Sequence, residues 1–325
     1  MLCSDRREMR YLPGLKTKAA PVGGLLLLCF LWALVSLRSD LLPGSLQVAR
    51  SSPLASEAVS LAVFAVIAAV AASLRKAPWP RGSKISATAL AGLGLFAVPS
   101  VLIEVANGTI SAATRVALFS LTPVFAVVLE PHLGSPSARQ QRGALAAALI
   151  AVFGTLLVFP LDVPLNVPRS GAVAFAFCAI LAAVVSVAAA NCLSVRLACE
   201  QSAPSMVSFA ALATGIAAIT LGASSALLER HTWSAPNLDP WTALDLSALV
   251  LLFWLMHRMT AVPMTTRFLI APLLANLIGL AFFRPGVQSQ GWVGLLLITA
   301  GSGWLLLGPT DEPEEKGSSL GIHQR

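Results

Sequence analysis

Residues 170–195 read SGAVAFAFCAILAAVVSVAAANCLSV, an apolar run without a single charged side chain. About 20 consecutive apolar residues are enough for one helix to cross a membrane. The run is continuously apolar and does not alternate with polar residues, which argues against the strands of an outer-membrane barrel. This stretch therefore predicts a transmembrane helix.

Similar runs fill most of the chain. Only 11% of the 325 residues are charged and 56% are hydrophobic, whereas an ordinary soluble domain carries about 25% charged residues. So few charges cannot cover the surface of a soluble protein of this size, but they suffice for the loops between membrane spans. Ten spans with short loops use nearly the whole chain, which leaves no room for a soluble domain of ordinary size. We predict an all-α membrane protein with ten transmembrane helices, at residues 23–43, 54–74, 85–104, 112–131, 143–160, 170–195, 204–228, 240–256, 261–283 and 290–308.

The positive charges predict the orientation. With a cytoplasmic tail at 1–22, the cytoplasmic segments hold 16 of the 22 lysines and arginines, and the opposite side holds 6. Basic residues favour the cytoplasmic side, so both termini, including the tail at 310–325, are predicted to be cytoplasmic, in a plasma (inner) membrane. The net charge of +7 is explained by these flanking residues, and no nucleic-acid partner is expected.

The second half of the chain resembles the first. A shift of 149 residues without a gap gives 10 identities over the 42 positions 119–160, among them Phe119 with Phe268 and Pro123 with Pro272. Prolines punctuate backbone geometry and therefore weigh more than apolar matches. Two units of five helices follow, at 23–160 and 170–309. An odd number of spans inverts one unit relative to the other, as in many transporters.

Two segments carry a resemblance to a known family. Residues 110–129 (ISAATRVALFSLTPVFAVVL) and 264–279 (MTTRFLIAPLLANLIG) resemble the fourth and ninth helices of EamA-type proteins in the drug/metabolite transporter superfamily. The resemblance implies a five-plus-five inverted repeat around a central cavity that faces the two sides alternately. Members often carry a glutamate after each of these helices, but residues 134–136 and 283–285 have none.

Prolines and a neighbouring amide are the first site candidates. Pro123 and Pro272 each remove a backbone donor and disturb the helix one turn upstream, so they predict kinked helices, which line either a substrate cavity or a packing interface. Asn276, four residues after Pro272, could bond a substrate or cross-link helices.

Charged and aromatic residues within the spans complete the candidate set. Arg115 and Arg267 precede the two prolines and either meet an anionic substrate or extend to lipid headgroups. Trp32 and Trp254 either wall the cavity or pack. Asp245, with Glu104 and Glu130 as weaker candidates, could carry a proton or simply be solvated at the interface.

Secondary transport of a small metabolite or drug-like solute is the function that these features favour. No GxxxxGK[ST] loop occurs, so no ATP hydrolysis through a P-loop is expected. No HExxH or other metal-ligand spacing occurs either, and we expect no metal, no cofactor and no enzymatic activity. Two alternatives stay open: an enzyme acting on a lipid-linked substrate, and a non-transporting helper in the bilayer. Besides substrate and lipid, a second copy of the chain is left open as a partner.

Overall fold

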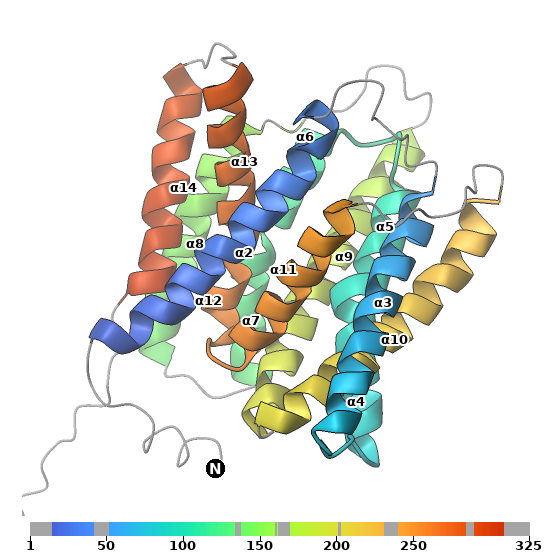
Figure 1. Cartoon of the computed structure of the whole chain (residues 1–325). Coiled ribbons are helices and arrows are strands. Elements are labelled where there is room, and N and C mark those ends of the chain that lie inside the picture. The colour runs from blue at the N-terminus through green and yellow to red at the C-terminus, as the bar shows by residue number, and fades with distance from the viewer. Residues whose placement is uncertain are drawn as a thin grey trace, which may run out of the picture.

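The computed structural model describes residues 15–41, 52–133, 138–159, 161, 170–200, 203–230, 240–283 and 289–308. These residues form helices and no strand (Figure 1). The first half contains α2 (Leu15–Leu41), α3 (Pro53–Leu74), α4 (Ser83–Gly92), η2 (Leu93–Ala97), α5 (Val98–Val105), α6 (Ala112–Phe119), α7 (Thr122–Leu133) and α8 (Ala138–Val158). The second half contains α9 (Ser170–Glu200), α10 (Ala203–Leu228), α11 (Pro240–Met256), α12 (Ala261–Thr265), α13 (Arg267–Phe283) and α14 (Ser289–Leu307).

Eight helical segments in the described chain are long and apolar enough to cross a membrane, as expected of an integral multi-pass membrane protein. A helix suits this environment because it satisfies its backbone hydrogen bonds internally. The apolar parts of α8 (Gly143–Val158) and α11 (Thr242–Met256) are shorter. These two coincide with the fifth and eighth predicted stretches, and the remaining predicted stretches coincide with the eight longer segments.

The first helix begins earlier than the sequence suggests. α2 starts at Leu15 and runs through Pro21, whereas the predicted span starts at residue 23. Its apolar part is Ala19–Leu37, so the first turns belong to the same helix as the span. Residues 1–14 of the predicted N-terminal tail and the whole predicted C-terminal tail lie outside the described residues.

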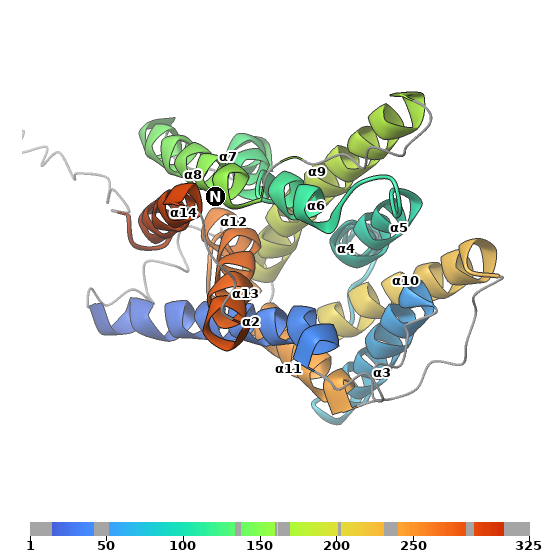
Figure 2. The same cartoon turned by 90° about the horizontal axis from the view of Figure 1, so that it is seen from above.

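Two long helix pairs stand at opposite ends of the molecule. α3 packs along α10 at one end, and α8 packs along α14 at the other. Viewed from above, the other helices fill the space between these two pairs (Figure 2). Helices from the two halves of the sequence therefore form both ends together.

Small residues allow α8 and α14 to approach closely. A Cβ atom added to Gly154 would lie 2.7 Å from the carbonyl oxygen of Gly294, and one added to Gly301 would lie 2.6 Å from that of Ala147. Between lipid-exposed helices, association depends on such close packing because lipid removes the hydrophobic driving force. The spacing i, i+7 of the glycines on α14 places both contacts on one face.

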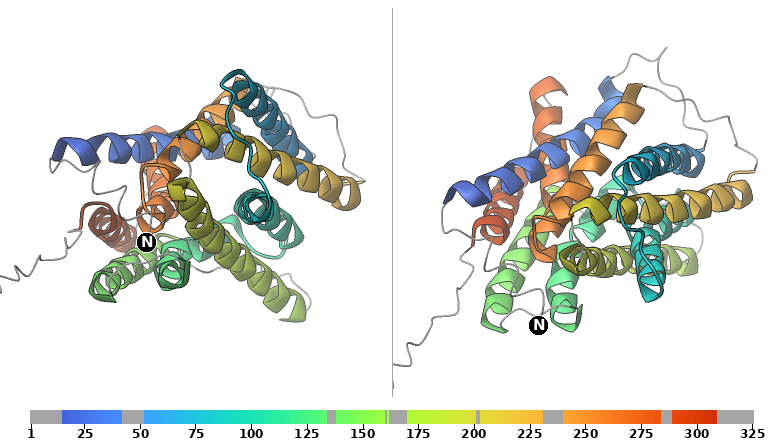
Figure 3. Two further views of the ribbon diagram at one scale, coloured as in Figure 1. Left: turned by 90° about the horizontal axis from the view of Figure 1, so that it is seen from below. Right: turned by 60° about the horizontal axis from the view of Figure 1, so that its bottom comes forward.

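Two sets of helices cross the middle of the molecule. α2 packs against α13 and α11, and α9 packs against α7, α5 and α4. Figure 3 shows both sets from two further directions. α12 lies between the sets and contacts α7, α9, α13 and α14. The middle of the molecule is therefore built around the broken segments α6–α7 and α12–α13.

Candidate functional site

Two of the candidate spans are interrupted. In the span Ala112–Leu133, α6 ends at Phe119 and α7 begins at Thr122; in the span Ala261–Phe282, α12 ends at Thr265 and α13 begins one residue after Thr266. Interrupted helices in membranes are tolerated where the backbone is buried in protein or lines a cavity. Because α12 contacts α7 and α13 contacts α6, the two interrupted segments lie side by side.

Buried hydroxyl groups stabilise both interruptions. Ser120, Thr122, Thr265 and Thr266 are all buried. Each donates its hydroxyl hydrogen to the carbonyl oxygen three residues earlier, at 2.6–2.7 Å. Such side chains compete with the backbone for carbonyl groups and bend or end helices. The freed carbonyls are therefore satisfied within the protein.

The prolines coincide with these interruptions only in the first half. Pro123 is buried at the start of α7, directly after the break, so the disturbance predicted one turn before it is confirmed. In the second half, α13 continues through Pro272, so this proline does not coincide with an interruption. The break lies at Thr266 instead, where the hydroxyl of that residue donates a hydrogen bond to the carbonyl oxygen of Pro263.

Phe119 and Phe268 join the two interrupted segments. Their ring centroids lie 5.9 Å apart with an interplanar angle of 31°, a distance typical of favourable aromatic pairs. Phe119 is the last residue of α6, and Phe268 is the second residue of α13.

Arg267 lies beside this aromatic pair and is almost completely enclosed by protein. It is 2% exposed. Its guanidinium carbon lies 4.8 Å from the ring centroid of Phe268 and 5.4 Å from that of Trp32 on α2. Cation–π contacts of this kind strengthen when they are removed from water. The structure thus brings together two residues that the sequence singled out separately, and it places Arg267 against protein rather than at headgroups.

One buried hydrogen-bond donor of Arg267 has no partner. Nη1 donates to the carbonyl oxygen of Met264 at 3.4 Å, and Nε is buried without a partner. Among the described residues, no carboxylate forms an ion pair with this guanidinium. Since a buried arginine normally uses its donors and its charge, this group is the strongest candidate for a ligand contact.

Two further polar groups without a partner lie on α9. Asn191 donates through Nδ2 to the carbonyl of Val187, but its Oδ1 is buried without a partner, as is Oγ of Ser194. The two residues are three positions apart and share one face of α9. α9 is also one of the helices that contact α12. Ser194 carries no signal in the sequence.

The other predicted site residues are more dispersed. Asn276 is half-buried and donates to the carbonyl of Pro272 at 3.1 Å. Arg115 and Asp245 are half-buried on α6 and α11. Trp254 is 39% exposed and stacks with Arg258 at 5.7 Å, so it lies apart from the cluster of Trp32, Arg267 and Phe268. We call that cluster the arginine cluster.

Comparison with known proteins gives a fold and no family. No family model matches the sequence, and no curated protein matches it significantly. A solved crystal structure of a protein is similar to this chain with a TM-score of 0.66 and 16% identity, over 89% of this chain and 99% of the other. At this identity the likeness concerns the fold alone, and the resemblance to EamA-type transporters remains a proposal.

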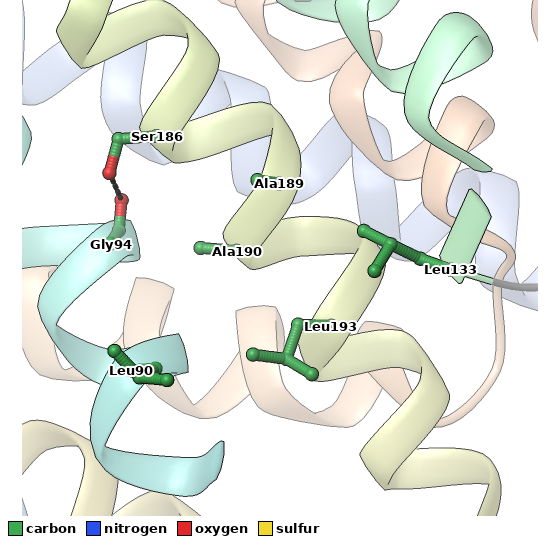
Figure 4. Close-up of a pocket in the computed structure, with 7 residues that line it drawn as sticks. All are labelled: Leu90, Gly94, Leu133, Ser186, Ala189, Ala190 and Leu193. Atoms are coloured by element: carbon green, nitrogen blue, oxygen red, sulfur yellow. Dashed lines mark hydrogen bonds between the residues drawn. The ribbon is translucent and has the colours of Figure 1, made fainter. Parts of the chain in front are cut away.

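A separate cavity of about 220 Å³ lies between α4, η2, α9 and the end of α7. Leu90, Leu133, Leu193 and two alanines line it, and Oγ of Ser186 donates to the carbonyl of Gly94 at its edge (Figure 4). The lining offers apolar surface and this one satisfied hydroxyl. It has none of the unsatisfied donors that distinguish the arginine cluster.

One buried carboxylate escaped the sequence analysis. Glu229 is 3% exposed and accepts hydrogen bonds from the backbone N–H groups of Leu54 and Ala55, at 2.8 and 3.2 Å, and from the hydroxyl of Ser225. It thereby caps the first turn of α3, whose own N-cap, Ser52, makes no side-chain cap bond. The two backbone donors that it caps lie 174–175 residues away in the chain, so no local pattern could indicate this role.

Metal chemistry has no visible basis in the part of the chain that the structure describes. Within it, no group of three or more histidine, cysteine or acidic side chains could hold a metal ion. The site is therefore described by its hydrogen-bond donors, its aromatic rings and its single buried cation.

Proposed function

We propose that this protein is a secondary transporter of a small solute, in which two inverted five-helix units alternately expose a central site. The observation that carries the proposal is Arg267: a buried guanidinium without a carboxylate partner, at an interrupted span between the two halves. Ionisable residues inside membrane segments are costly and mark substrate or ion pathways. Interrupted helices near the membrane midplane are the usual place for such sites.

The helix contacts support the inverted repeat. If α2, α3, α4–α5, α6, α7 and α8 correspond in order to α9, α10, α11, α12, α13 and α14, the most extensive contacts between the halves have equivalents. The contact of α2 with α13 corresponds to that of α9 with α7, and the contact of α2 with α11 corresponds to that of α9 with α4 and α5. In the pairs α3–α10 and α8–α14, each helix contacts its own equivalent in the other half. A two-fold relation between the halves produces this pattern.

A transport assay tests the proposal directly. Purified protein is first screened for thermal stabilisation against a metabolite panel, since a ligand of the folded state raises the melting temperature. Each stabilising solute is then tested by counterflow in proteoliposomes, where a carrier exchanges labelled for unlabelled solute. Exchange that is saturable and absent from protein-free vesicles supports transport. A solute that binds and is chemically unchanged but never exchanged supports the helper function instead, and conversion of the solute supports an enzyme.

A further inference from the structure

The edge of the Arg267 guanidinium that carries Nε defines the shape of its missing partner. Nη1 is directed at the carbonyl of Met264, and Nε is buried without a partner. Nε–H and one N–H of Nη2 point in the same direction and match the two oxygen atoms of a carboxylate. The edge that carries the unpartnered Nε–H is therefore the one suited to bind an oxyanion through two parallel hydrogen bonds.

The aromatic rings restrict the approach of that partner. Phe268 and Trp32 stack against the guanidinium, 4.8 and 5.4 Å from its carbon. The neighbouring Cys29 and Met264 are buried and weakly polar. A ligand that reaches Nε in the plane of the guanidinium therefore places the rest of its body against aromatic and apolar side chains. A flat or apolar organic body fits these surroundings better than a strongly hydrated one.

The charge of the surroundings limits the charge of the ligand. The position equivalent to Arg267 in the first half, 149 residues earlier, is Leu118, which packs in an apolar cluster with Ile180 and Val184. The second half thus contributes one cation, Arg267, and the equivalent position in the first half is apolar. A single buried cation is neutralised by one negative charge, and a second charge would itself be buried without a partner.

We propose that the transported solute is a small organic monocarboxylate, bound through its carboxylate to the Nε edge of Arg267 with its body against Trp32. This inference rests on the proposed transport function. Because Arg267 is 2% exposed, the solute reaches it only when the helices around the arginine cluster part, as alternating access requires.

Binding in detergent tests the inference without transport. The probes are benzoate, its neutral counterpart benzamide, acetate and inorganic phosphate, each titrated against the melting temperature of the full-length protein. Benzoate is expected to bind at least about tenfold more tightly than benzamide, the difference that a charge-assisted hydrogen bond gives. It is also expected to exceed acetate because of its ring. Equal stabilisation by benzoate and benzamide, stronger stabilisation by phosphate, or no stabilisation by either carboxylate overturns the proposal.

Variants locate the effect at the arginine cluster. Arg267→Gln is expected to abolish the preference for benzoate over benzamide, and Arg267→Lys to restore it in part, because lysine keeps the charge without the planar fork. Trp32→Leu is expected to remove the advantage of benzoate over acetate while the charge preference stays. Arg258→Gln is the matched control, since Arg258 also stacks on a tryptophan but outside the cluster. Unchanged benzoate binding in Arg267→Gln contradicts the inference. If this variant fails to fold, the inference is tested by the comparison of benzoate with benzamide in the wild type and by the loss of the benzoate advantage over acetate in Trp32→Leu.

Counterflow separates the two proposals. Benzoate that binds through Arg267 but is never exchanged leaves the anion site standing and refutes transport. Exchange of a neutral or cationic solute at the wild-type rate by Arg267→Gln leaves transport standing and refutes the anion site.

Discussion

Phe119 and Phe268 occupy equivalent positions in the two halves of the sequence, and their rings contact each other at 5.9 Å. Two equivalent residues of a two-fold repeat meet only where the axis passes between them. The contact therefore marks the place where the proposed symmetry axis crosses the structure. Arg267 is the neighbour of Phe268 in the chain and lies over its ring, so the arginine cluster lies next to this proposed axis, which is where inverted-repeat transporters place their sites.

The aromatic contact is expected to couple the two halves energetically. In a double-mutant cycle with Phe119→Leu and Phe268→Leu, melting in detergent should show a coupling of about 0.5–1.5 kcal/mol beyond the sum of the single effects. Phe64→Leu combined with Phe119→Leu is the control, because Phe64 stacks on Phe253 in a different cluster and should add independently. Additive effects for Phe119 and Phe268 would contradict the contact.

The packing of α8 on α14 predicts opposite effects for two glycines of α14. Alanine in place of glycine favours a helix by up to about 1 kcal/mol, so Gly303→Ala, with nothing within 4 Å of the new methyl group, should leave the melting temperature unchanged or raise it. Gly301→Ala should lower it, because the methyl group would lie 2.6 Å from the carbonyl oxygen of Ala147. Overpacking costs about 1–3 kcal/mol. A rise for Gly301→Ala would show that α8 and α14 do not pack this closely.

The break before Pro123 is expected to matter for transport more than for folding. Pro123→Ala restores a backbone donor at the start of α7 and favours a continuous helix. Counterflow should fall by more than the amount of folded protein, as measured by elution profile and melting temperature. Pro131→Ala, near the exposed end of the same helix, is the control and should retain activity. Pro272→Ala should have the smaller effect of the two repeat-related prolines, because α13 is continuous there. Parallel loss of folding and activity in Pro123→Ala would assign the proline to packing.

Glu229 is expected to stabilise the pairing of α3 with α10. The carboxylate of Glu229 accepts hydrogen bonds from Leu54 N, Ala55 N and Ser225 Oγ. Glutamine has only one acceptor oxygen, and its NH₂ group would face one or more of these donors without being able to accept a hydrogen bond from them. Leaving a buried donor unsatisfied costs about 1–3 kcal/mol, so Glu229→Gln should melt several degrees lower than the wild type. Glu104→Gln is the control, since Glu104 is half-buried and its carboxylate accepts a long hydrogen bond, at 3.5 Å, from the exposed side chain of Asn107. An unchanged melting temperature for Glu229→Gln would show that the cap is dispensable.

Local patterns explain why the helices could be predicted and their contacts could not. A membrane span is a local property of about 20 residues, and the predicted stretches fall on helices for that reason. The break at Thr266 was not predicted, because it coincides with the hydroxyl hydrogen bonds of Thr265 and Thr266 to backbone carbonyls, which the sequence does not show. Trp32 and Arg267 were singled out for separate reasons, but their contact depends on the packing of α2 on α13. Charge and aromatic character are visible in a sequence, whereas the missing partner of a buried donor is visible only in a structure.

The basic residues predict the orientation of the chain. Reporter fusions after Gly44, Arg81, Leu165 and Leu320 should read outside, inside, outside and inside, because 16 of 22 basic residues then lie on the cytoplasmic side. The fusion after Gly44 follows the first predicted span and the fusion after Leu165 follows the fifth, so agreement between them requires an even number of crossings between these two sites. The Leu320 fusion then reports whether the second unit has the opposite orientation. If it reads outside, the number of crossings after Leu165 is even. The two units could not then be inverted five-helix repeats, and the proposed transport mechanism would lose its architectural basis.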